Sequence, residues 1–189
     1  MMKTLLVVPS EHEIYGKITP PEHPHLGILY IAAILQRDGH DVKTADFDAE
    51  LLTFQTFANI LTDYNPDIVG ITATTPVFNN AVKIAEFTKK HSSAKTLIGG
   101  IHPTLMPLET MASGVFDFAV KGEGEESIAE LFKCLESGGK LSTVRGILYR
   151  VDEKNYENEN RPFIDDLDTI PFPARKLLKN KKYTYPDAL

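Results

Sequence analysis

Glycine and threonine residues follow three of the short apolar runs in this sequence, where they are able to shape a binding site. One run leads into Thr72-Ala73-Thr74-Thr75, which carries three hydroxyl groups. The other two lead into Gly99-Gly100-Ile101-His102 and Gly122-Glu123-Gly124. Glycine permits positive φ and places no Cβ between the backbone and a ligand. Any one of these segments is typical of a tight turn, but the three together predict a broad pocket for a bulky ligand.

The dipeptide Pro9-Ser10 follows the first apolar run and argues against the usual nucleotide-binding loops. A dinucleotide-binding protein has Gly-x-Gly-x-x-Gly at this place, and no Walker-type Gly-Lys-Ser/Thr occurs in the sequence. The dipeptide begins a connection of 17 residues, 9–25, and connections of this length are usually functional or disordered. We expect this loop to be one wall of the pocket without acting as a phosphate loop.

Residue types suited to catalysis or metal binding occur, but their spacing defines no such site. Glu123 and Glu125 would stand at the start of a helix, where acidic side chains offset the helix dipole. His23 and His25 lack further ligands at a defined spacing. The single cysteine, Cys134, forms neither a disulfide within the chain nor a cysteine-ligated iron–sulfur cluster by itself. We assign no catalytic residue and no metal ligand.

Apolar, β-branched runs alternate with longer helical patterns along most of the chain. Strands are predicted at residues 4–8, 42–45, 68–72, 96–98 and 116–120. Helices are predicted at residues 26–37, 49–64, 76–91, 104–113 and 125–137. Asp48 and Thr75 are predicted helix N-caps, and Gly39 a helix end. Because the strand runs are continuous rather than alternating, both faces of the sheet should be covered by helices.

This alternation predicts an α/β fold of the doubly wound, Rossmann- or flavodoxin-like kind, with five parallel strands in the order 2-1-3-4-5. Ligands of such sheets bind beyond the carboxyl ends of the strands, where the strand order reverses. That point lies between the first and third strands. The α/β domain is predicted to cover residues 1–140. A β-hairpin appendage follows at 141–164, with strands at 145–151 and 159–164, and residues 165–189 are predicted to be a linker.

Composition narrows the function classes further. The 20 basic and 26 acidic side chains give a net charge of -6, which argues against binding to the phosphates of nucleic acid. The longest apolar run, residues 28–35, is far shorter than the ~20 residues that span a bilayer, so we expect no membrane partner. A lone cysteine fits a protein of the reducing cytoplasm.

Several motifs in register resemble those of a known family. They include Pro24-His25-Leu26-Gly27, Gly39-His40-Asp41-Val42, Gly99-Gly100-Ile101-His102-Pro103-Thr104, Gly122-Glu123-Gly124-Glu125 and the closing Leu167-Asp168-Thr169-Ile170-Pro171-Phe172-Pro173. In order and spacing they are similar to the cobalamin-binding domain that precedes the catalytic core in one branch of radical S-adenosylmethionine enzymes. The closing motif resembles the family's bridge to a catalytic barrel, so the chain is expected to be a piece of a longer enzyme.

The resemblance implies that cobalamin is the ligand and that a C-terminal radical S-adenosylmethionine domain is missing. In the full-length protein, it also implies a four-iron four-sulfur cluster and S-adenosylmethionine. The Asp-x-His-x-x-Gly motif of the methionine synthase group is absent, so neither His25 nor His102 is assigned as a cobalt ligand. Cobalamin would then be bound with its own base detached. The candidate cofactor-binding residues are Pro9, Ser10, Thr72, Ala73, Thr74, Thr75, Gly99, Gly100, Ile101, His102, Gly122, Glu123 and Gly124.

Three functions remain open at this point. The chain is a cobalamin-binding module for methyl transfer, rearrangement or cyclisation, a scaffold of the same fold without a cofactor, or a free-standing flavodoxin- or receiver-like regulator. The last lacks the paired acidic residues expected after its first strand, where Pro9-Ser10 stands. For the first, we predict that the nucleotide tail enters near 72–75 and 99–102. We further predict that Gly100 lines this cavity, where any Cβ would intrude on the ligand.

Overall fold

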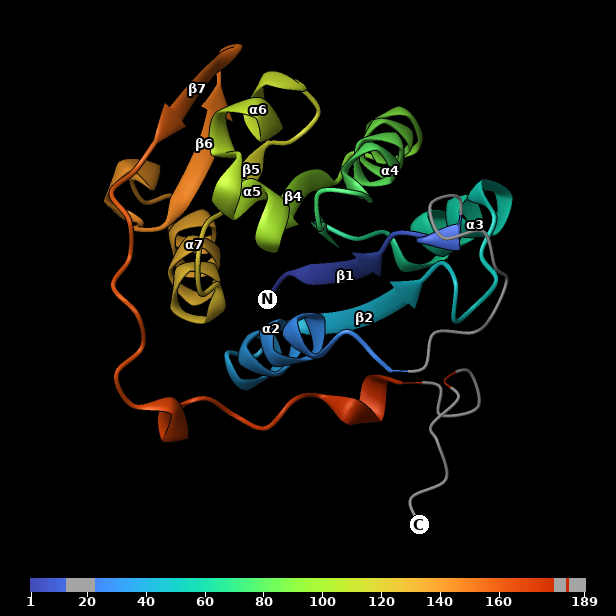
Figure 1. Ribbon diagram of the computed structural model, residues 1–189, viewed down its shortest axis with the longest axis horizontal. Helices are drawn as coiled ribbons and strands as arrows, with labels where there is room; N and C mark the ends of the chain where they lie inside the picture. The colour runs from blue at the N-terminus through green and yellow to red at the C-terminus, as the bar shows by residue number, and fades with distance from the viewer. Residues whose placement is uncertain (13–22, 179–182, 184–189) are drawn as a thin grey trace.

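A seven-stranded sheet forms the centre of the computed structural model, which describes residues 1–12, 23–178 and 183 (Figure 1). The other parts of the predicted loop 9–25 and of the predicted linker 165–189 lie outside the described residues. The five parallel strands are β1 (Lys3–Val8), β2 (Asp41–Asp46), β3 (Ile68–Thr72), β4 (Lys95–Gly99) and β5 (Phe118–Val120). They lie in the order β2-β1-β3-β4-β5, which confirms the predicted topology and the doubly wound class.

The predicted count of five strands is wrong because the hairpin continues the same sheet. Strand β6 (Ile147–Val151) pairs antiparallel with β5, and β7 (Lys154–Glu157) pairs with β6. Asp152 and Glu153 both have positive φ, 48° and 64°. Positive φ at both central residues is typical of a two-residue type I′ hairpin, so the second strand begins directly at Lys154 and not at the predicted residue 159.

Helices cover both faces of the parallel part of the sheet. Helices α2 (Leu26–Arg37) and α7 (Glu125–Ser137) pack on one face, against residues such as Leu6, Val8 and Leu97. Helices α3 (Phe54–Tyr64), α4 (Phe78–His91) and the short α6 (Pro107–Ala112) pack on the other, against residues such as Leu5 and Val7. Alternate residues of each strand therefore serve two separate cores, as the continuous apolar runs predicted.

Several predicted helix boundaries are wrong for local reasons. Helix α3 begins after Thr53, which forms a capping box with Thr56, so Asp48 is not its N-cap. Helix α4 has Val77 as its N-cap residue, without a side-chain hydrogen bond, so Thr75 does not cap it. The helix predicted at 104–113 is two short helices, α5 (Ile101–Leu105) and α6. Proline disfavours helical backbone in the residue before it, and Met106, before Pro107, has left the helical region at φ -128° and ψ 55°.

Residues 165–178, which we call the strap, run past α7 and then alongside α2 (Figure 1). The Ala174 N–H donates to the carbonyl oxygen of Leu29 in α2 at 3.0 Å. Ile170, Ala174 and Leu177 pack against the core that α2 and α7 share. Two short 3-10 helices lie within the strap, η2 (Leu167–Thr169) and η3 (Arg175–Leu177), and a third, η1 (Leu141–Thr143), precedes β6. The described part of the predicted linker is thus packed on the domain.

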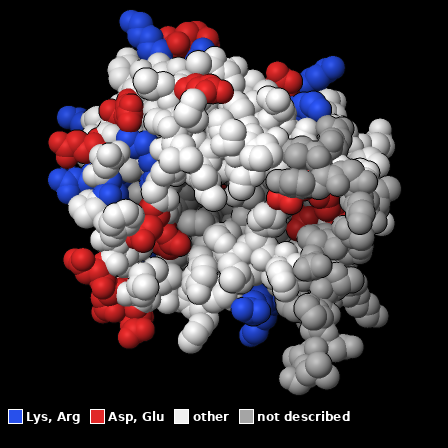
Figure 2. All heavy atoms as spheres, in the orientation of Figure 1, with Lys and Arg blue, Asp and Glu red and all other residues white. Residues whose placement is uncertain are grey.

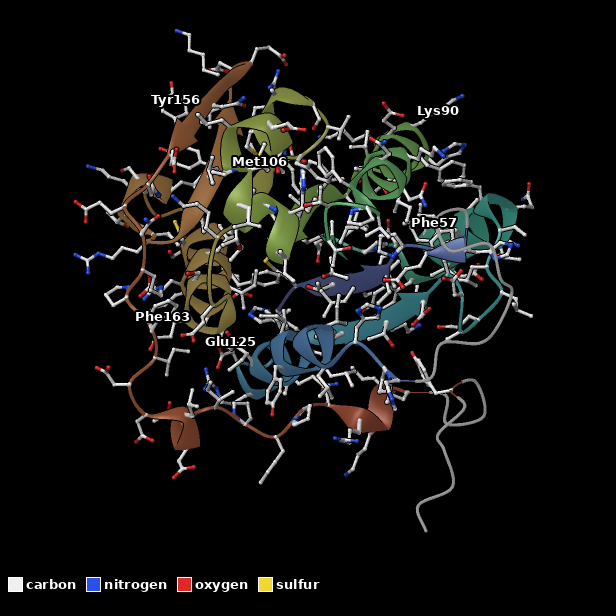
Figure 3. The ribbon with its side chains drawn as sticks, viewed as in Figure 1. Phe57, Lys90, Met106, Glu125, Tyr156 and Phe163 are labelled. Carbon is white, nitrogen blue, oxygen red and sulfur yellow. The ribbon has the colours of Figure 1, made fainter. Side chains whose placement is uncertain are left out.

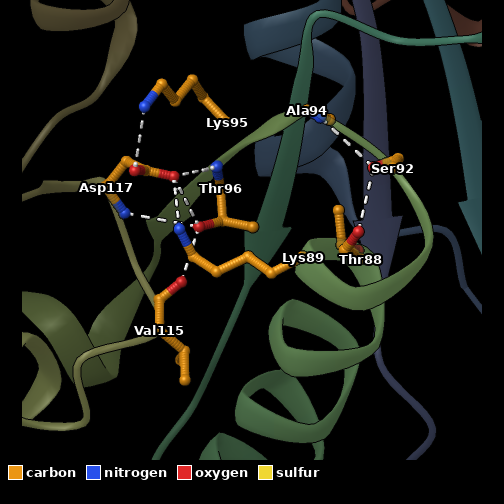
Figure 4. A network of polar contacts seen from close by, with 8 residues as sticks. All are labelled: Thr88, Lys89, Ser92, Ala94, Lys95, Thr96, Val115 and Asp117. Atoms are coloured by element: carbon orange, nitrogen blue, oxygen red, sulfur yellow. Dashed lines mark hydrogen bonds and ion pairs between the residues drawn. The ribbon is translucent and has the colours of Figure 1, made fainter.

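A polar network fixes the amino edge of the sheet between β4 and β5 (Figure 4). One Asp117 carboxylate oxygen accepts hydrogen bonds from the Thr96 amide at 2.8 Å and from the Thr96 hydroxyl at 3.0 Å. The Lys89 ammonium lies 2.9 Å from the same oxygen, and that of Lys95 lies 3.4 Å from the other. Burial alone would raise the pKa of Asp117, but these partners outweigh it and hold the pKa below its ordinary value.

Candidate functional site

A pocket of about 240 Å³ opens between α2 and α7 at the carboxyl edge of the sheet. We call it the inter-helix pocket. Leu6, Ile28, Leu97 and Ile128 give it apolar walls, and its rim carries Gly99 and Gly122. The strands that contribute to it include β1 and β3, which flank the predicted switch point. Binding crevices of doubly wound sheets lie at this place.

Gly70, in the middle of β3, lies in the floor of the inter-helix pocket. A Cβ built on Gly70 would lie 2.8 Å from Cδ2 of Leu6 and 3.6 Å from Cδ2 of Leu97. The missing side chain lets these two leucines lie across the strand, and the pocket reaches down to the backbone. Sequence reasoning did not select Gly70, although glycine within a strand is a known sign of close approach by a ligand or another chain segment.

Two of the predicted rim glycines face open space. No heavy atom lies within 4 Å of a Cβ built on Gly99 or on Gly122. Gly124 is more enclosed, because its Cβ would lie 3.2 Å from Cδ1 of Ile31. The backbone at Gly99 and Gly122 is therefore accessible from the pocket, and a larger residue at either position would occupy the space at its mouth.

Gly100 serves the backbone rather than the ligand, so the predicted reason for this glycine is wrong. It lines the inter-helix pocket, but its Cβ would point away and meet the carbonyl oxygen of Ala73 at 2.8 Å and the Thr72 hydroxyl at 3.0 Å. Its φ of 105° and ψ of -164° belong to a region that only glycine adopts readily. The Ala73 amide donates to Gly99 at 2.9 Å, and the His102 amide donates to Ala73 at 3.0 Å. Gly100 lets these two loops pack backbone against backbone.

His102 and Ile101, neighbours in α5, point in different directions. His102 is only 2% exposed, and its ring stacks on Phe78 with the centroids 3.9 Å apart. Its Nδ1 lies 3.2 Å from the Thr75 hydroxyl, and burial lowers the pKa of the imidazole. Ile101 is 59% exposed. His102 is therefore not in contact with the inter-helix pocket, whereas Thr72 lines it.

The structure separates Pro9 and Ser10 from the inter-helix pocket. Pro9 is buried. The Ser10 hydroxyl lies 2.5 Å from Oδ1 of Asp48, and its carbonyl oxygen accepts from the Asn80 side chain at 2.9 Å. Ser10 lines a different cavity of about 240 Å³ beside the first turns of α3 and α4. Asp48, predicted to cap a helix, instead holds this loop.

Acidic side chains border the inter-helix pocket on the side of the strap. Glu123 and Glu125 line it together with an adjoining cavity of about 450 Å³, which Asp168 and Phe172 of the strap also line. The Ile164 amide donates to Glu123 at 2.7 Å. Figure 3 shows Glu125 at the start of α7, where this helix approaches α2. The strap thus forms an outer wall beside the pocket.

The surface carries charges of both signs. Figure 2 shows acidic and basic side chains interspersed on the face in view, with no continuous basic surface there. Within residues 1–12, 23–178 and 183, no helix has the length and the apolar character needed to cross a membrane.

Two curated relatives are similar to this chain along nearly its whole length. An uncharacterized methyltransferase of Pyrococcus horikoshii is 37% identical over 185 residues, which cover 97% of this chain and 40% of the relative. An anaerobic magnesium-protoporphyrin IX monomethyl ester cyclase of Synechocystis sp. is 29% identical over 188 residues, which cover 97% of this chain and 38% of the relative. The chain therefore spans about two fifths of the length of these relatives.

Solved structures with a similar fold come from cobalamin-dependent radical enzymes. The radical S-adenosylmethionine enzyme OxsB, with aqua-cobalamin and S-adenosylmethionine bound, aligns with a TM-score of 0.78 and 20% identity over 92% of this chain and 24% of that one. The methyltransferase TsrM of Kitasatospora setae aligns with a TM-score of 0.71 and 19% identity over 84% of this chain and 30% of that one. At these identities the likeness shows a shared fold.

The family itself follows from the sequence comparison. The family model of the B12 binding domain matches residues 15–132, more than half of the chain. This match agrees with the resemblance carried by the motifs at 24–27, 99–104 and 122–125. Together with a relative that is 37% identical along nearly all of it, the match shows that the chain belongs to the B12-binding domain family.

Proposed function

We propose that the inter-helix pocket receives the nucleotide tail of cobalamin, with the corrin ring lying over the carboxyl edge of the sheet. The observation that carries this proposal is the apolar pocket itself, which reaches the backbone at Gly70 and is open at Gly99 and Gly122. Bound cobalamin would supply a cobalt centre able to carry a methyl group. The residues of this chain hold and orient the cofactor.

The pocket residues suit a detached aromatic base. Leu6, Leu97 and Ile128 offer apolar surface for a flat ring, and the open backbone at Gly99 allows close approach of the attached sugar. The charged residues among the described lining are acidic, Glu123 and Glu125. An anionic phosphate is disfavoured beside these carboxylates, so we expect the phosphate of the tail to lie on the Gly99 side of the mouth.

Ligation of cobalt by this chain is not part of the proposal. His102 is buried against Phe78 and bonded to Thr75, which leaves it unavailable to a metal over the sheet edge. His25 lines a small cavity beside Asp46 and does not line the inter-helix pocket. We therefore favour a cofactor bound with its own base detached and with no described histidine beneath the metal.

For the whole protein, we propose a radical S-adenosylmethionine enzyme whose catalytic domain docks near the carboxyl edge. Exposed apolar side chains at this edge support docking: Ile101 in α5, and Leu105 and Leu108 at 66% and 67% exposure. Met106 lies between the two short helices (Figure 3). Phe172 of the strap is 94% exposed. The catalytic domain would supply the iron–sulfur cluster and the S-adenosylmethionine site, and methyl transfer, rearrangement and cyclisation all remain open.

We also propose a cytoplasmic location and a division of the chain into an α/β domain, an edge hairpin and a strap. The cysteine Cys134 is a buried, free thiol, which fits a reducing compartment.

Filling the pocket at Gly99 tests the binding proposal. A Cβ at Gly99 meets no heavy atom within 4 Å, so Gly99→Val fills the mouth without straining the fold. We expect this variant to bind hydroxocobalamin at least about tenfold more weakly than the wild-type chain in equilibrium dialysis. Lys154→Val, at an exposed position of β7, is the matched control and should bind normally. Normal binding by a folded Gly99→Val chain would place the tail elsewhere, and no binding by the wild-type chain would favour a scaffold without a cofactor.

A further inference from the structure

His102 links the loop after β3 to the turn after β4, although it does not line the inter-helix pocket. Its amide donates to the carbonyl oxygen of Ala73 at 3.0 Å, and its Nδ1 lies 3.2 Å from Oγ1 of Thr75. Its ring stacks on Phe78 with an interplanar angle of 25°. The backbone and one face of the ring are thus held, which places Nδ1 opposite Thr75.

The protonation of His102 follows from its burial. Burial lowers the pKa of the imidazole from about 6.5, while the Glu109 carboxylate in α6 acts in the opposite direction with a smaller effect. The ring is therefore neutral at pH 7 and carries one N–H. Nε2 is buried, and it has no hydrogen-bond partner among the described residues. A buried N–H without a partner is avoided in native structures, so the proton belongs on Nδ1.

With the proton on Nδ1, the ring donates to Thr75 Oγ1, and the Thr75 hydroxyl must direct its own proton elsewhere. Thr75 is exposed in the loop that follows β3. Thr72 of the same loop lines the inter-helix pocket, whereas Thr75 lies outside its lining. Because Thr75 is exposed and His102 is buried, the hydroxyl proton of Thr75 is free to bond a group outside the protein.

We propose that His102 is a positioning residue that orients the Thr75 hydroxyl as a hydrogen-bond donor to an amide carbonyl oxygen at the periphery of the corrin ring. This inference rests on the proposed cobalamin site and assigns a specific donor within it. His102 touches no ligand atom and acts only through Thr75. The two residues therefore work as one unit, and the loss of either removes the same hydrogen bond.

A double-mutant cycle tests this unit with the wild-type chain and hydroxocobalamin. Thr75→Val removes the hydroxyl while keeping the branched shape, and His102→Phe keeps an aromatic ring against Phe78 while removing Nδ1. Each is expected to weaken binding about fivefold, the value of one neutral hydrogen bond. The double variant should also lose about fivefold rather than about twenty-five-fold, because the interaction is shared.

Conservative variants separate positioning from a structural role. His102→Asn places an amide N–H near the position of Nδ1 and should keep the affinity within about twofold of wild type. Thr62→Val, on α3, removes an exposed hydroxyl that bonds the Ala58 carbonyl oxygen and should leave binding unchanged. Circular dichroism without ligand should show that Thr75→Val is folded, although its thermal midpoint should fall because the buried Nδ1–H of His102 loses its acceptor.

The outcomes distinguish this inference from the proposed function. If the two losses multiply, or if His102→Asn loses as much affinity as His102→Phe, the inference is overturned while wild-type binding upholds the cobalamin site. If the wild-type chain binds no hydroxocobalamin, both proposals fail. Should His102→Phe not fold, His102→Gln supplies the same cycle, because its amide extends beyond the Nδ1 position.

Discussion

The two edges of the sheet are built from different residue types. At the amino edge, charged side chains meet backbone amides: Asp117 binds the amide of Thr96, and Asp67 accepts from the amide of Lys3 at 2.7 Å. At the carboxyl edge, small residues meet backbone, and Gly99 faces open space. Asp117 and Asp67 thus find their partners within the protein, whereas the backbone at Gly99 and Gly122 borders open space. Under the proposed function, stabilising contacts would lie at one end of the parallel strands and cofactor binding at the other.

The neighbouring glycines of the carboxyl edge give the largest expected contrast. Gly100→Ala should lower the free energy of unfolding by about 3 kcal/mol, because the new Cβ meets Ala73 in a backbone region reserved for glycine. Gly99→Ala should change it by less than about 0.5 kcal/mol. Urea denaturation of both variants measures these free energies of unfolding. Equal losses would show that the two glycines share one role.

The amino edge should respond in stability alone. Asp117→Ala removes the acceptor for the Thr96 amide and the partner of Lys89, and should cost about 2 kcal/mol of unfolding free energy with unchanged affinity for hydroxocobalamin. Thr62→Val provides a surface control in the same denaturation series. If an Asp117 variant folds normally but no longer binds cobalamin, the proposal that the amino edge contributes only to stability is wrong.

Acid should weaken the network of Asp117. Its pKa is lowered in the folded state, so its contribution to stability is present above the ordinary value of about 3.8 and is lost as the pH falls through the folded-state pKa. Thermal midpoints of wild type and Asp117→Asn, measured from pH 6 to pH 2, should therefore converge at the acidic end. A constant difference in thermal midpoint across this range would show that the charge of the Asp117 carboxylate does not contribute to stability.

The smallest effect is expected at His102. A lowered pKa means that the unfolded chain binds a proton more readily, so stability is complete above about pH 6.5 and falls as the pH drops toward the folded-state pKa. His102→Asn should lack this slope between pH 7 and pH 5. The comparison uses thermal midpoints in matched buffers. If both chains show the same pH dependence, groups other than His102 cause it.

The sequence predicts the α/β fold because short strand-like runs alternate with helical patterns, and Ile68–Thr72 is predicted at its observed bounds. It also predicts glycine-rich strand exits, and Gly99 and Gly122 are found at the pocket. Its errors have two causes: more than one residue can fill the same structural role, and residue types do not show in which direction a side chain points. Asp48 and Thr53 are both suitable caps, and the sequence does not show that Asp48 is engaged by Ser10.

The apolar floor of the site was missed for a related reason. In the sequence, Leu6 and Leu97 have the pattern of ordinary core residues. They line a pocket because they lie beside Gly70, which has no side chain. The direction of the absent Cβ at Gly100 depends on backbone angles that residue types do not encode. Residue types therefore indicated where the pocket lies, and geometry was needed to separate the residues that face the pocket from those that support the loops.

The strap brings the late part of the chain back to the carboxyl edge. Leu177 accepts from the Thr44 hydroxyl of β2 at 3.4 Å, and the Tyr183 hydroxyl donates to Asp46, the last residue of β2, at 3.0 Å. The catalytic domain that we propose for the whole protein would therefore be tethered close to the edge where the pocket opens. Short tethers give local concentrations in the millimolar range. Docking over the cofactor would then need only weak intrinsic affinity, which leaves such a domain free to separate and close again during a reaction cycle.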